Sequence, residues 1–279
     1  MKGKRVMITG ASRGIGREAA RALARKGADL VLVVRDRARG EEVASELRSA
    51  CGVEVEVLVG DLSSLADVKR VAEELLARHD RLDVLVNNAG ALLMERQVTA
   101  DGYEATFATN HLAYFFLTDL LRGALEKAAP SRVVNVSSDA HHRGAMRWDD
   151  LMSEQRWSGW RAYCDSKLAN VLFTAELARR LEGTGVTANA LHPGVIASNF
   201  ARNNRGVVGF AWTMMGPFLT KPDEGAKTTV YLASSPEVEG VTGRYFVRCR
   251  EAKPSREARD PEAAKRLWEI SEELVRKAR

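Results

Sequence analysis

Short runs of apolar, β-branched residues alternate with amphipathic helical patterns along almost the whole chain. RVMIT (5–9), DLVLVV (29–34) and EVEVLV (54–59) are typical strands, and helical patterns such as 16–27 and 39–50 lie between them. Strands that are apolar throughout are buried on both faces, which indicates a parallel sheet covered by helices on both sides. Right-handed crossovers then predict a doubly wound, Rossmann-type α/β fold with a mostly parallel sheet of about seven strands.

No linker, repeat or low-complexity tract interrupts the 279 residues, and 45% hydrophobic residues suffice for one sizeable core. We therefore predict a single Rossmann-type domain over residues 1–279. Its glycine-rich cofactor half covers about 1–130, and its catalytic and substrate-loop half covers about 131–249. A charged helical tail follows over 250–279.

Charge and cysteine usage exclude several classes of protein. The 42 basic residues are spread among 37 acidic ones, so the net charge of +5 does not indicate nucleic-acid binding. Cys51, Cys164 and Cys249 are far apart and odd in number, which favours a reducing compartment and predicts neither a disulfide framework nor a metal site. We see no signal peptide and no apolar run near the roughly 18 residues of a membrane span, so we expect a cytoplasmic protein.

A glycine-rich turn joins the first strand to the first helical pattern. In TGASRGIG (9–16), Gly10, Gly14 and Gly16 leave backbone amides open to a pyrophosphate, since no Cβ intrudes and a helix start carries partial positive charge. The spacing is GxxxGxG and not GxGxxG, but the strand–turn–helix context matches a dinucleotide site. The turn therefore predicts a bound dinucleotide; a turn needed only for packing is the alternative.

The end of the second strand distinguishes the two forms of that cofactor. Asp36 lies 20 residues after Gly16, where an acid would hold the ribose 2′-hydroxyl of NAD(H). Arg35 directly follows the strand, however, and Arg13 lies within the glycine turn. Two guanidinium groups can bind one 2′-phosphate. We therefore favour NADP(H), with NAD(H) as the alternative.

Tyr163 and Lys167 stand four residues apart in the helical pattern RAYCDSKLAN (161–170). Residues at this spacing share a helix face. A free tyrosine has a pKa of about 10, and a cation within about 4–6 Å favours its phenolate. We therefore expect Lys167 to lower the pKa of Tyr163 for acid–base work. The tyrosines without such a lysine are interpreted as packing residues: Tyr103, Tyr114, Tyr231 and Tyr245.

Seven motifs now stand in one order along the chain: TGASRGIG, GDL (60–62), NNAG (87–90), TNH (109–111), VNVSS (134–138), YCDSK (163–167) and HPG (192–194). In this order they resemble the short-chain dehydrogenases/reductases, over nearly the whole chain. Longer segments such as NHLAYFFLTDLL and AYCDSKLANVLFTAELARRL are similar to the retinol dehydrogenase branch. Membrane-bound relatives carry an apolar anchor before the first strand, and this chain begins at the strand, so we expect a soluble form.

The resemblance implies a role for each matching residue. Tyr163 would be the general acid/base, and Lys167 would lower its pKa and hold the nicotinamide ribose. Ser138 would hydrogen-bond the substrate oxygen, and Asn110 would anchor a water in a proton relay. The predicted cofactor contacts are Gly10, Ser12, Arg13, Gly14, Ile15, Gly16, Arg35, Asp61, Leu62, Asn88, Ala89, Gly90, Tyr163, Lys167, Pro193, Gly194, Ile196 and Ser198.

An apolar stretch after HPG predicts the kind of substrate. Its large apolar side chains would form an adaptable lid over the cofactor cleft, which favours an apolar alcohol or carbonyl such as a retinal, a long-chain aldehyde or a ketone. A subunit interface and a peripheral contact with a lipid surface are the alternatives. The lid residues are Phe200, Phe210, Trp212, Met214, Met215 and Phe218.

Several other residues have plainer interpretations. His141 and His142 are adjacent, so we expect their side chains to point apart and to bind no metal. Cys164 is interpreted as a small packing residue. The tryptophans either belong to the core or border an apolar substrate pocket: Trp148, Trp157 and Trp160.

We therefore predict an NADP(H)-dependent alcohol dehydrogenase or carbonyl reductase that forms a homo-oligomer. One alternative is an epimerase or dehydratase on the same scaffold, which would keep NAD bound and show no net absorbance change. Another is a dinucleotide sensor without enzyme activity. The set Asn110, Ser138, Tyr163 and Lys167 argues against a sensor, which needs no proton relay.

Overall fold

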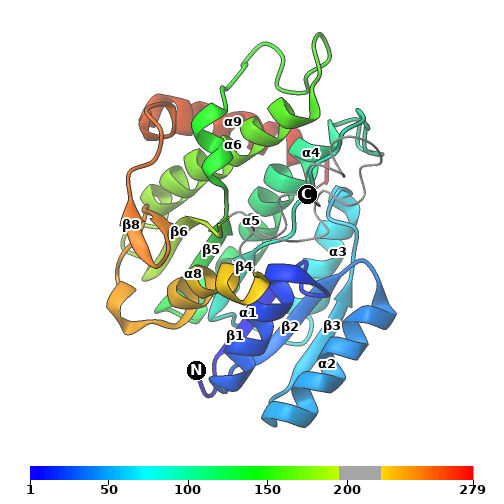
Figure 1. The fold of residues 1–279 in the computed structure, drawn as a ribbon, viewed down its shortest axis with the longest axis vertical. Helices are drawn as coiled ribbons and strands as arrows, with labels where there is room; N and C mark the ends of the chain where they lie inside the picture. The colour runs from blue at the N-terminus through cyan, green and yellow to red at the C-terminus, as the bar shows by residue number, and fades with distance from the viewer. Residues whose placement is uncertain (195–220, 279) are drawn as a thin grey trace.

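An eight-stranded sheet with helices on both faces forms the frame of the protein (Figure 1). The computed structural model describes residues 1–194 and 221–278. The strand order is β3-β2-β1-β4-β5-β6-β7-β8, and every pair of neighbours is parallel except β7 and β8. The strands are β1 (Arg5–Thr9), β2 (Asp29–Val34), β3 (Val55–Val59), β4 (Val84–Asn87), β5 (Ser131–Val136), β6 (Val186–His192), β7 (Tyr245–Val247) and β8 (Arg250–Ala252).

Helices cover the two faces of the sheet in separate groups. Side chains of α1, α2 and α8 pack on one face, and those of α3, α5 and α6 pack on the other, with α9 against α6. The helices are α1 (Gly14–Arg25), α2 (Arg37–Cys51), α3 (Leu65–Leu76), α4 (Ala105–Phe107), α5 (Ala113–Lys127), α6 (Gly159–Arg180), α8 (Pro222–Ser234) and α9 (Pro261–Val275). None of the described helices has both the length and the apolar composition needed to cross a bilayer.

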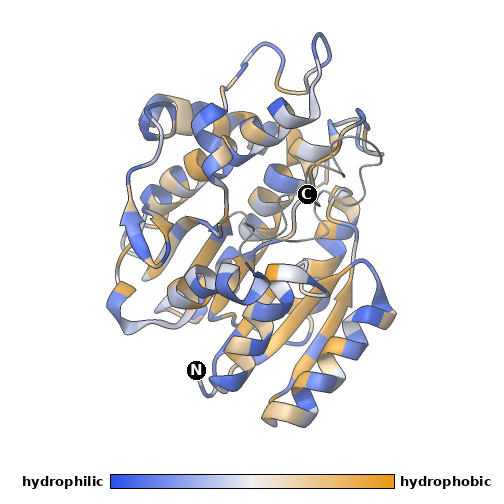
Figure 2. Ribbon diagram, in the orientation of Figure 1, coloured by the Kyte–Doolittle hydropathy of each residue, from blue (hydrophilic) through white to orange (hydrophobic). Residues whose placement is uncertain are grey.

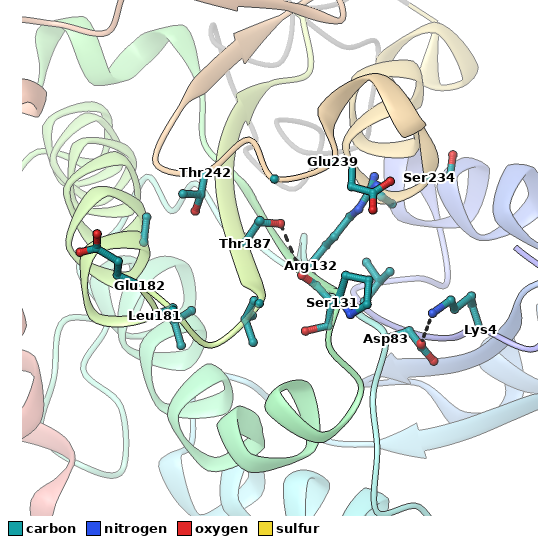
Figure 3. Close-up of a pocket in the computed structure, with 18 of the residues that line it drawn as sticks. Lys4, Asp83, Ser131, Arg132, Leu181, Glu182, Thr187, Ser234, Glu239 and Thr242 are labelled. Carbon is teal, nitrogen blue, oxygen red and sulfur yellow. Dashed lines mark hydrogen bonds and ion pairs between the residues drawn. The ribbon is translucent and has the colours of Figure 1, made fainter.

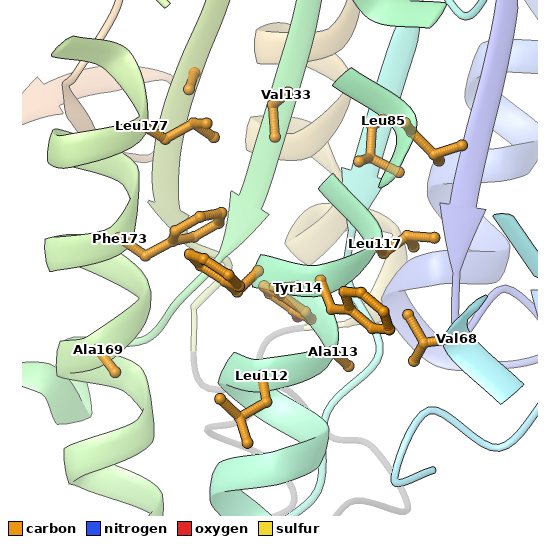
Figure 4. Packing of buried hydrophobic residues seen from close by; sticks show 14 of the residues in the cluster. Val68, Leu85, Leu112, Ala113, Tyr114, Leu117, Val133, Ala169, Phe173 and Leu177 are labelled. Carbon is orange, nitrogen blue, oxygen red and sulfur yellow. The ribbon is translucent and has the colours of Figure 1, made fainter. Parts of the chain in front are cut away.

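Alternation along the strands divides the core into two layers. Val6 and Ile8 of β1 pack with α1 and α2, whereas Met7 between them packs on the opposite face. Successive strand residues point to opposite faces, so strands that are apolar throughout serve both layers, as Figure 2 shows. The layer beneath α5 and α6 is rich in aromatic residues and includes Tyr114 and Phe173 (Figure 4). The predicted α/β fold is confirmed.

Two details of the prediction need correction. The predicted tail over 250–279 begins with an eighth strand, β8, which pairs antiparallel with β7. The segment around 103–127, whose sequence predicts one long helix, is not one regular helix, because a π-helical turn, η1 (Ala108–Leu112), separates α4 from α5. The division of a single domain into halves stays a prediction.

Candidate active site

The strand order reverses between β1 and β4. From β1 the chain builds the sheet outward through β2 and β3, and from β4 it builds the other way through β5 and β6. In open α/β sheets, ligands bind outside the carboxyl ends of the strands at such a switch point. The glycine turn follows β1 and the NNAG motif follows β4, so both predicted cofactor motifs lie at this edge.

Thr9, the last residue of β1, joins these two motifs. Its side chain is fully buried, and its Oγ1 accepts hydrogen bonds from the amides of Asn88 (2.8 Å) and Ala89 (2.9 Å). Asn88 Nδ2 donates in turn to the Thr9 carbonyl at 2.7 Å. The sequence analysis missed Thr9; its one signal is a hydroxyl residue ending an otherwise apolar strand.

The predicted glycines are required by their surroundings. Gly10 and Gly14 have φ of +69° and +55°, which side chains rarely adopt. A Cβ on Gly10 would lie 2.9 Å from Ala89 Cα, and one on Gly16 would lie 2.5 Å from the Gly10 carbonyl oxygen. Helix α1 starts at Gly14 without a side-chain cap. A cradle of this kind, open at a helix N-terminus, suits a pyrophosphate.

Of the two charged residues that follow β2, Asp36 caps a helix and Arg35 is available for a ligand. Asp36 caps α2: its Oδ1 accepts from the Arg39 amide, and its Oδ2 lies 3.2 Å from Arg39 Nε. Arg13 and Arg35 are exposed, and within the described part of the chain neither has a carboxylate partner. Asp61, after β3, is exposed, and its carboxylate accepts from the amide and hydroxyl of Ser63. Two free guanidinium groups therefore lie at the end of the sheet where cofactor selection was predicted.

Ser138, Tyr163 and Lys167 come together at the carboxyl end of β5. Ser138 hydrogen-bonds Tyr163 through its side chain. Lys167 Nζ lies 5.6 Å from the centre of the Tyr163 ring and donates to the carbonyl of Val136 at 3.0 Å. Ser137 Oγ donates to the carbonyl of Lys167 at 2.7 Å. These two bonds fix α6 against the end of β5.

Asn110 lies in η1, and its side-chain amide bonds three protein groups. Its Oδ1 accepts from the Ala91 amide at 2.7 Å, and its Nδ2 donates to the Ala91 carbonyl and to Ser166 Oγ, both at 2.9 Å. A Cβ on Gly90 would lie 3.2 Å from Asn110 Oδ1 and 3.5 Å from Lys167 Nζ. The structure therefore brings Asn110 beside Lys167, but its amide holds protein groups in place.

The pKa values differ from the expectation. Burial raises the pKa of Tyr163 to about 12, and the hydrogen bond from Ser138 offsets this only in part. Burial also lowers the pKa of Lys167 to about 7, so near neutral pH this group carries less positive charge than an exposed lysine. Desolvation thus outweighs the predicted effect of Lys167 on the Tyr163 phenol.

The histidine pair also differs from the expectation. The rings of His141 and His142 do not point apart, because their centres are 4.0 Å from each other. Oxygen and nitrogen ligand atoms of Asp139 and both histidines lie within 4.8 Å of one another. Both ring nitrogens of His141 are nevertheless occupied: Nδ1 bonds the Ser138 carbonyl at 2.7 Å, and Nε2 accepts from the Ser255 amide at 3.1 Å. A metal there would have to displace a protein hydrogen bond.

The three tryptophans do not form one cluster. Trp148 stacks on the Arg266 guanidinium, and Trp157 Nε1 donates to Glu104 at 3.2 Å. Trp160 is 46% exposed, and its ring centre lies 5.9 Å from that of Tyr163. Trp160 therefore borders the candidate site. Cys164 is buried, and burial raises the pKa of its thiol to about 11, as suits a packing residue.

The end of β6 also reaches this edge, where Pro193 and Gly194 follow His192. Asp139 donates its amide to His192 Nδ1 at 3.1 Å, so this end is tied to the chain that follows Ser138. The remaining predicted cofactor contacts, Ile196 and Ser198, lie outside the described residues. The predicted lid residues Phe200, Phe210, Trp212, Met214, Met215 and Phe218 also lie outside them.

A hollow of about 730 Å³ lies at the opposite edge of the sheet, where β4, β5 and β6 begin (Figure 3). Lys4 Nζ pairs there with Asp83 at 2.8 Å. Arg132 Nη1 donates to the carbonyls of Leu232 (3.0 Å) and Ser235 (2.8 Å) at the end of α8. Neighbouring protein groups therefore hold these cations, and none of the predicted site residues lines this hollow.

Comparisons with known proteins agree with this geometry. A family model described as short chain dehydrogenase matches residues 4–207. Human retinol dehydrogenase 14 is 46% identical over 99% of this chain and 87% of that protein. Bovine retinol dehydrogenase 12 is 45% identical over 98% of this chain and 86% of that protein.

Solved structures give the same result for the fold. An uncharacterised protein from Mycobacterium paratuberculosis has a TM-score of 0.81 and 37% identity, over 99% of this chain and 94% of that one. Pseudomonas aeruginosa RhlG in an NADP active-site complex has a TM-score of 0.71 and 29% identity, over 88% of this chain and 94% of that one. The first of these similarities extends over nearly the whole chain, so it covers the candidate site as well as the sheet.

Proposed function

The chain belongs to the short-chain dehydrogenase family of oxidoreductases, and we propose that it reduces apolar carbonyl compounds, or oxidises the corresponding alcohols, with NADP(H). The observation that carries this proposal is the meeting of Ser138, Tyr163 and Lys167 at the switch point of the sheet. This arrangement supports acid–base chemistry by the Tyr163 phenol at the end of the sheet where the glycine turn suits a dinucleotide.

The residues around β1 and α1 fit such a cofactor. Side chains on Gly10 or Gly16 would collide with the protein's own atoms and distort the turn, and the uncapped start of α1 would hold the pyrophosphate. When bound, the nicotinamide supplies or accepts the hydride. For a 2′-phosphate, Arg13 and Arg35 are free among the described residues, whereas Asp36 already caps α2. These contacts favour NADP(H), the ligand named for the Pseudomonas structure.

Tyr163 supplies the proton in this proposal. Its raised pKa of about 12 keeps the phenol protonated near neutral pH, as the acid in a carbonyl reduction must be. The proton passes from the Tyr163 hydroxyl to the substrate oxygen as that oxygen gains negative charge. Ser138 donates to the same region and orients the oxygen, and Lys167 stabilises the phenolate that remains.

An exposed apolar surface beside Tyr163 supports an apolar substrate. Trp160 is 46% exposed and Met94 is 39% exposed. A Cβ on Gly159 would lie 3.2 Å from Met94 Cα, so the main chain at Met94 packs against the start of α6, next to Trp160. Large exposed apolar side chains that gather beside polar groups are typical of a ligand site.

A spectrophotometric screen tests the proposal. Oxidation of NADPH at 340 nm is followed with retinal, long-chain and short-chain alkanals, steroids and quinones, and the screen is repeated with NADH. We expect turnover of apolar carbonyls with a preference for NADPH. Cofactor that stays bound during purification, with no net absorbance change for any carbonyl, would contradict the proposal and indicate an epimerase or dehydratase.

A further inference from the structure

Two buried histidines each stand close in sequence to a predicted catalytic residue. His111 directly follows Asn110 in η1, and His141 lies three residues after Ser138 in the 3-10 turn η2 (Asp139–Arg143). The structure buries both histidines completely. Burial of a polar ring is costly unless hydrogen bonds compensate it, yet neither histidine has a role in the proposed chemistry. Their partners therefore indicate what the two rings do.

His141 joins the main chain at Ser138 to the C-terminal segment, which we define as residues 253–275. Its Nδ1 lies 2.7 Å from the Ser138 carbonyl oxygen. A carbonyl can only accept, so Nδ1 carries the proton. Burial lowers the pKa of His141 to about 4, so the ring is neutral near pH 7 and its Nε2 is an acceptor. The amide of Ser255, between β8 and α9, donates to that Nε2 at 3.1 Å.

His111 makes a second link, from η1 to α9. Its Nε2 lies 2.8 Å from Ser271 Oγ. The single hydroxyl proton of Ser271 is donated to the Leu267 carbonyl at 2.7 Å, so Oγ accepts from the imidazole. Burial lowers the pKa of His111 to about 3, so this ring is also neutral near pH 7. Helix α9 is thereby bonded to the π-helical turn.

The core holds the C-terminal segment firmly, as a support for both links must be held. Trp268 of α9 packs against the rings of Phe115 and Phe173, whose centres lie 4.8 and 5.9 Å from its own. Leu267 and Val275 are fully buried in the layer beneath α5 and α6. A site is held most precisely by residues whose own positions are locked by packing. Helix α9 therefore offers both histidines a fixed attachment.

We propose that the C-terminal segment positions the candidate active site through these two histidine links. This inference rests on the proposed function. His141 is then a positioning residue for Ser138, whose side chain hydrogen-bonds Tyr163. His111 has the same role for the turn that carries Asn110. Neither histidine exchanges a proton in this role. A displacement of about 1 Å near reacting groups can lower a rate by about 10²-fold, so the links affect catalysis without contacting the substrate.

The substitution His141→Asn cuts the first link on one side only. An Asn amide nitrogen lies about where Nδ1 lies in histidine, so the variant keeps the bond to the Ser138 carbonyl and loses the bond to Ser255. The readout is NADPH oxidation in single-turnover stopped flow with a saturating apolar carbonyl. We expect its rate constant to fall about tenfold. A sample that is partly unfolded would lose amplitude and keep the rate constant.

The second link is tested from α9. Ser271→Ala removes the acceptor of His111 Nε2 and should lower the same rate constant several-fold. Tyr103→Phe is the matched control, because the Tyr103 hydroxyl also bonds α9, at the Leu274 carbonyl (2.7 Å). Tyr103 lies before α4, outside the two turns that carry predicted catalytic residues. The control should lower Tm and leave the rate constant unchanged.

Wild-type rate constants for His141→Asn and Ser271→Ala would overturn the inference. A fall of the same size in Tyr103→Phe would also overturn it, because any loosening of α9 would then have the effect. Variants that lose only amplitude would overturn it as well. Tyr163→Phe, assayed alongside, separates the two proposals. Full turnover by Tyr163→Phe would contradict the proposed function itself, whereas an inactive Tyr163→Phe with wild-type rate constants in the link variants would contradict only the role of the C-terminal segment.

Discussion

Replacing Thr9 by valine tests whether one hydroxyl joins the two cofactor motifs. The two side chains have similar shapes, so the substitution removes the hydrogen bonds and leaves the packing. Two amides, of Asn88 and Ala89, lose an acceptor at 2.8 and 2.9 Å. An amide left without a partner costs about 1–3 kcal/mol, and because both lie partly buried we take the lower part of that range. We therefore expect the free energy of unfolding to fall by about 2–4 kcal/mol.

The chain offers a matched control for this substitution. Thr106 is also fully buried, but its Oγ1 has no hydrogen-bond partner among the residues that the structure describes. Thr106→Val should therefore leave the stability unchanged or raise it, because it removes a buried polar atom that lacks a partner. Thermal unfolding followed by circular dichroism compares the two variants. At about 2–4 °C per kcal/mol, Thr9→Val should lower Tm by roughly 4–16 °C.

Cofactor binding gives a second measurement on the same variant. Without the Thr9 hydroxyl, the turns after β1 and β4 keep the bond from Asn88 Nδ2 to the Thr9 carbonyl but lose the two bonds to the Asn88 and Ala89 amides, so the Kd for NADPH should rise several-fold in a fluorescence titration. Equal Tm values for Thr9→Val and Thr106→Val would refute the reasoning. A lower Tm with unchanged NADPH affinity would show that the Thr9 bonds stabilise the fold without shaping the cofactor site.

Three further substitutions test the cofactor and substrate assignments. Arg35→Ala removes one of the guanidinium groups beside α2. The preference for NADPH over NADH in kcat/KM should fall by about 10–100-fold, which corresponds to the loss of one charged hydrogen bond. An unchanged ratio would contradict the NADP(H) assignment. Gly16→Ala places a Cβ 2.5 Å from the Gly10 carbonyl oxygen and should weaken NADPH binding. In the control Gly123→Ala the new Cβ meets no atom within 4 Å, so the substitution should be neutral or stabilise α5 by up to about 1 kcal/mol. Equal effects of the two substitutions on NADPH binding would count against the role of the glycine turn. Trp160→Ala should raise KM for long-chain alkanals more than for short-chain ones, and Trp148→Ala should affect neither, so the reverse pattern would remove Trp160 from the substrate site.

The alternation of strands and helices predicts most of the fold because each apolar strand must be covered on both faces. Strand β8 escapes this reasoning, since it has only three residues, Arg250–Ala252, and no apolar run. Hydrogen bonding to β7 stabilises this strand, and a local sequence pattern does not predict which strands pair. The π-helical turn at η1 is missed because it spans only five residues, too few to show a periodicity of its own.

For the candidate site, too, the sequence predicts which residue types come together but not the environment that surrounds them. The motifs predicted that Ser138, Tyr163, Lys167 and Asn110 lie together, and the structure places them at one edge of the sheet. The direction of the Tyr163 pKa shift could not be predicted, because it depends on how deeply the fold buries the phenol and the ammonium group. The role of Thr9 likewise depends on contacts between segments far apart in sequence.

The comparison of wild type with Tyr163→Phe most directly tests the central claim that Tyr163 is the acid–base group of a hydride-transfer enzyme. The substitution removes one hydroxyl and keeps the ring beside Lys167. NADPH oxidation is measured with the best apolar carbonyl, and NADPH affinity is measured by fluorescence on the same samples. We expect kcat to fall by about 10²–10⁴-fold while the Kd for NADPH changes less than about twofold. A Tyr163→Phe variant that keeps the kcat of the wild type would contradict the account.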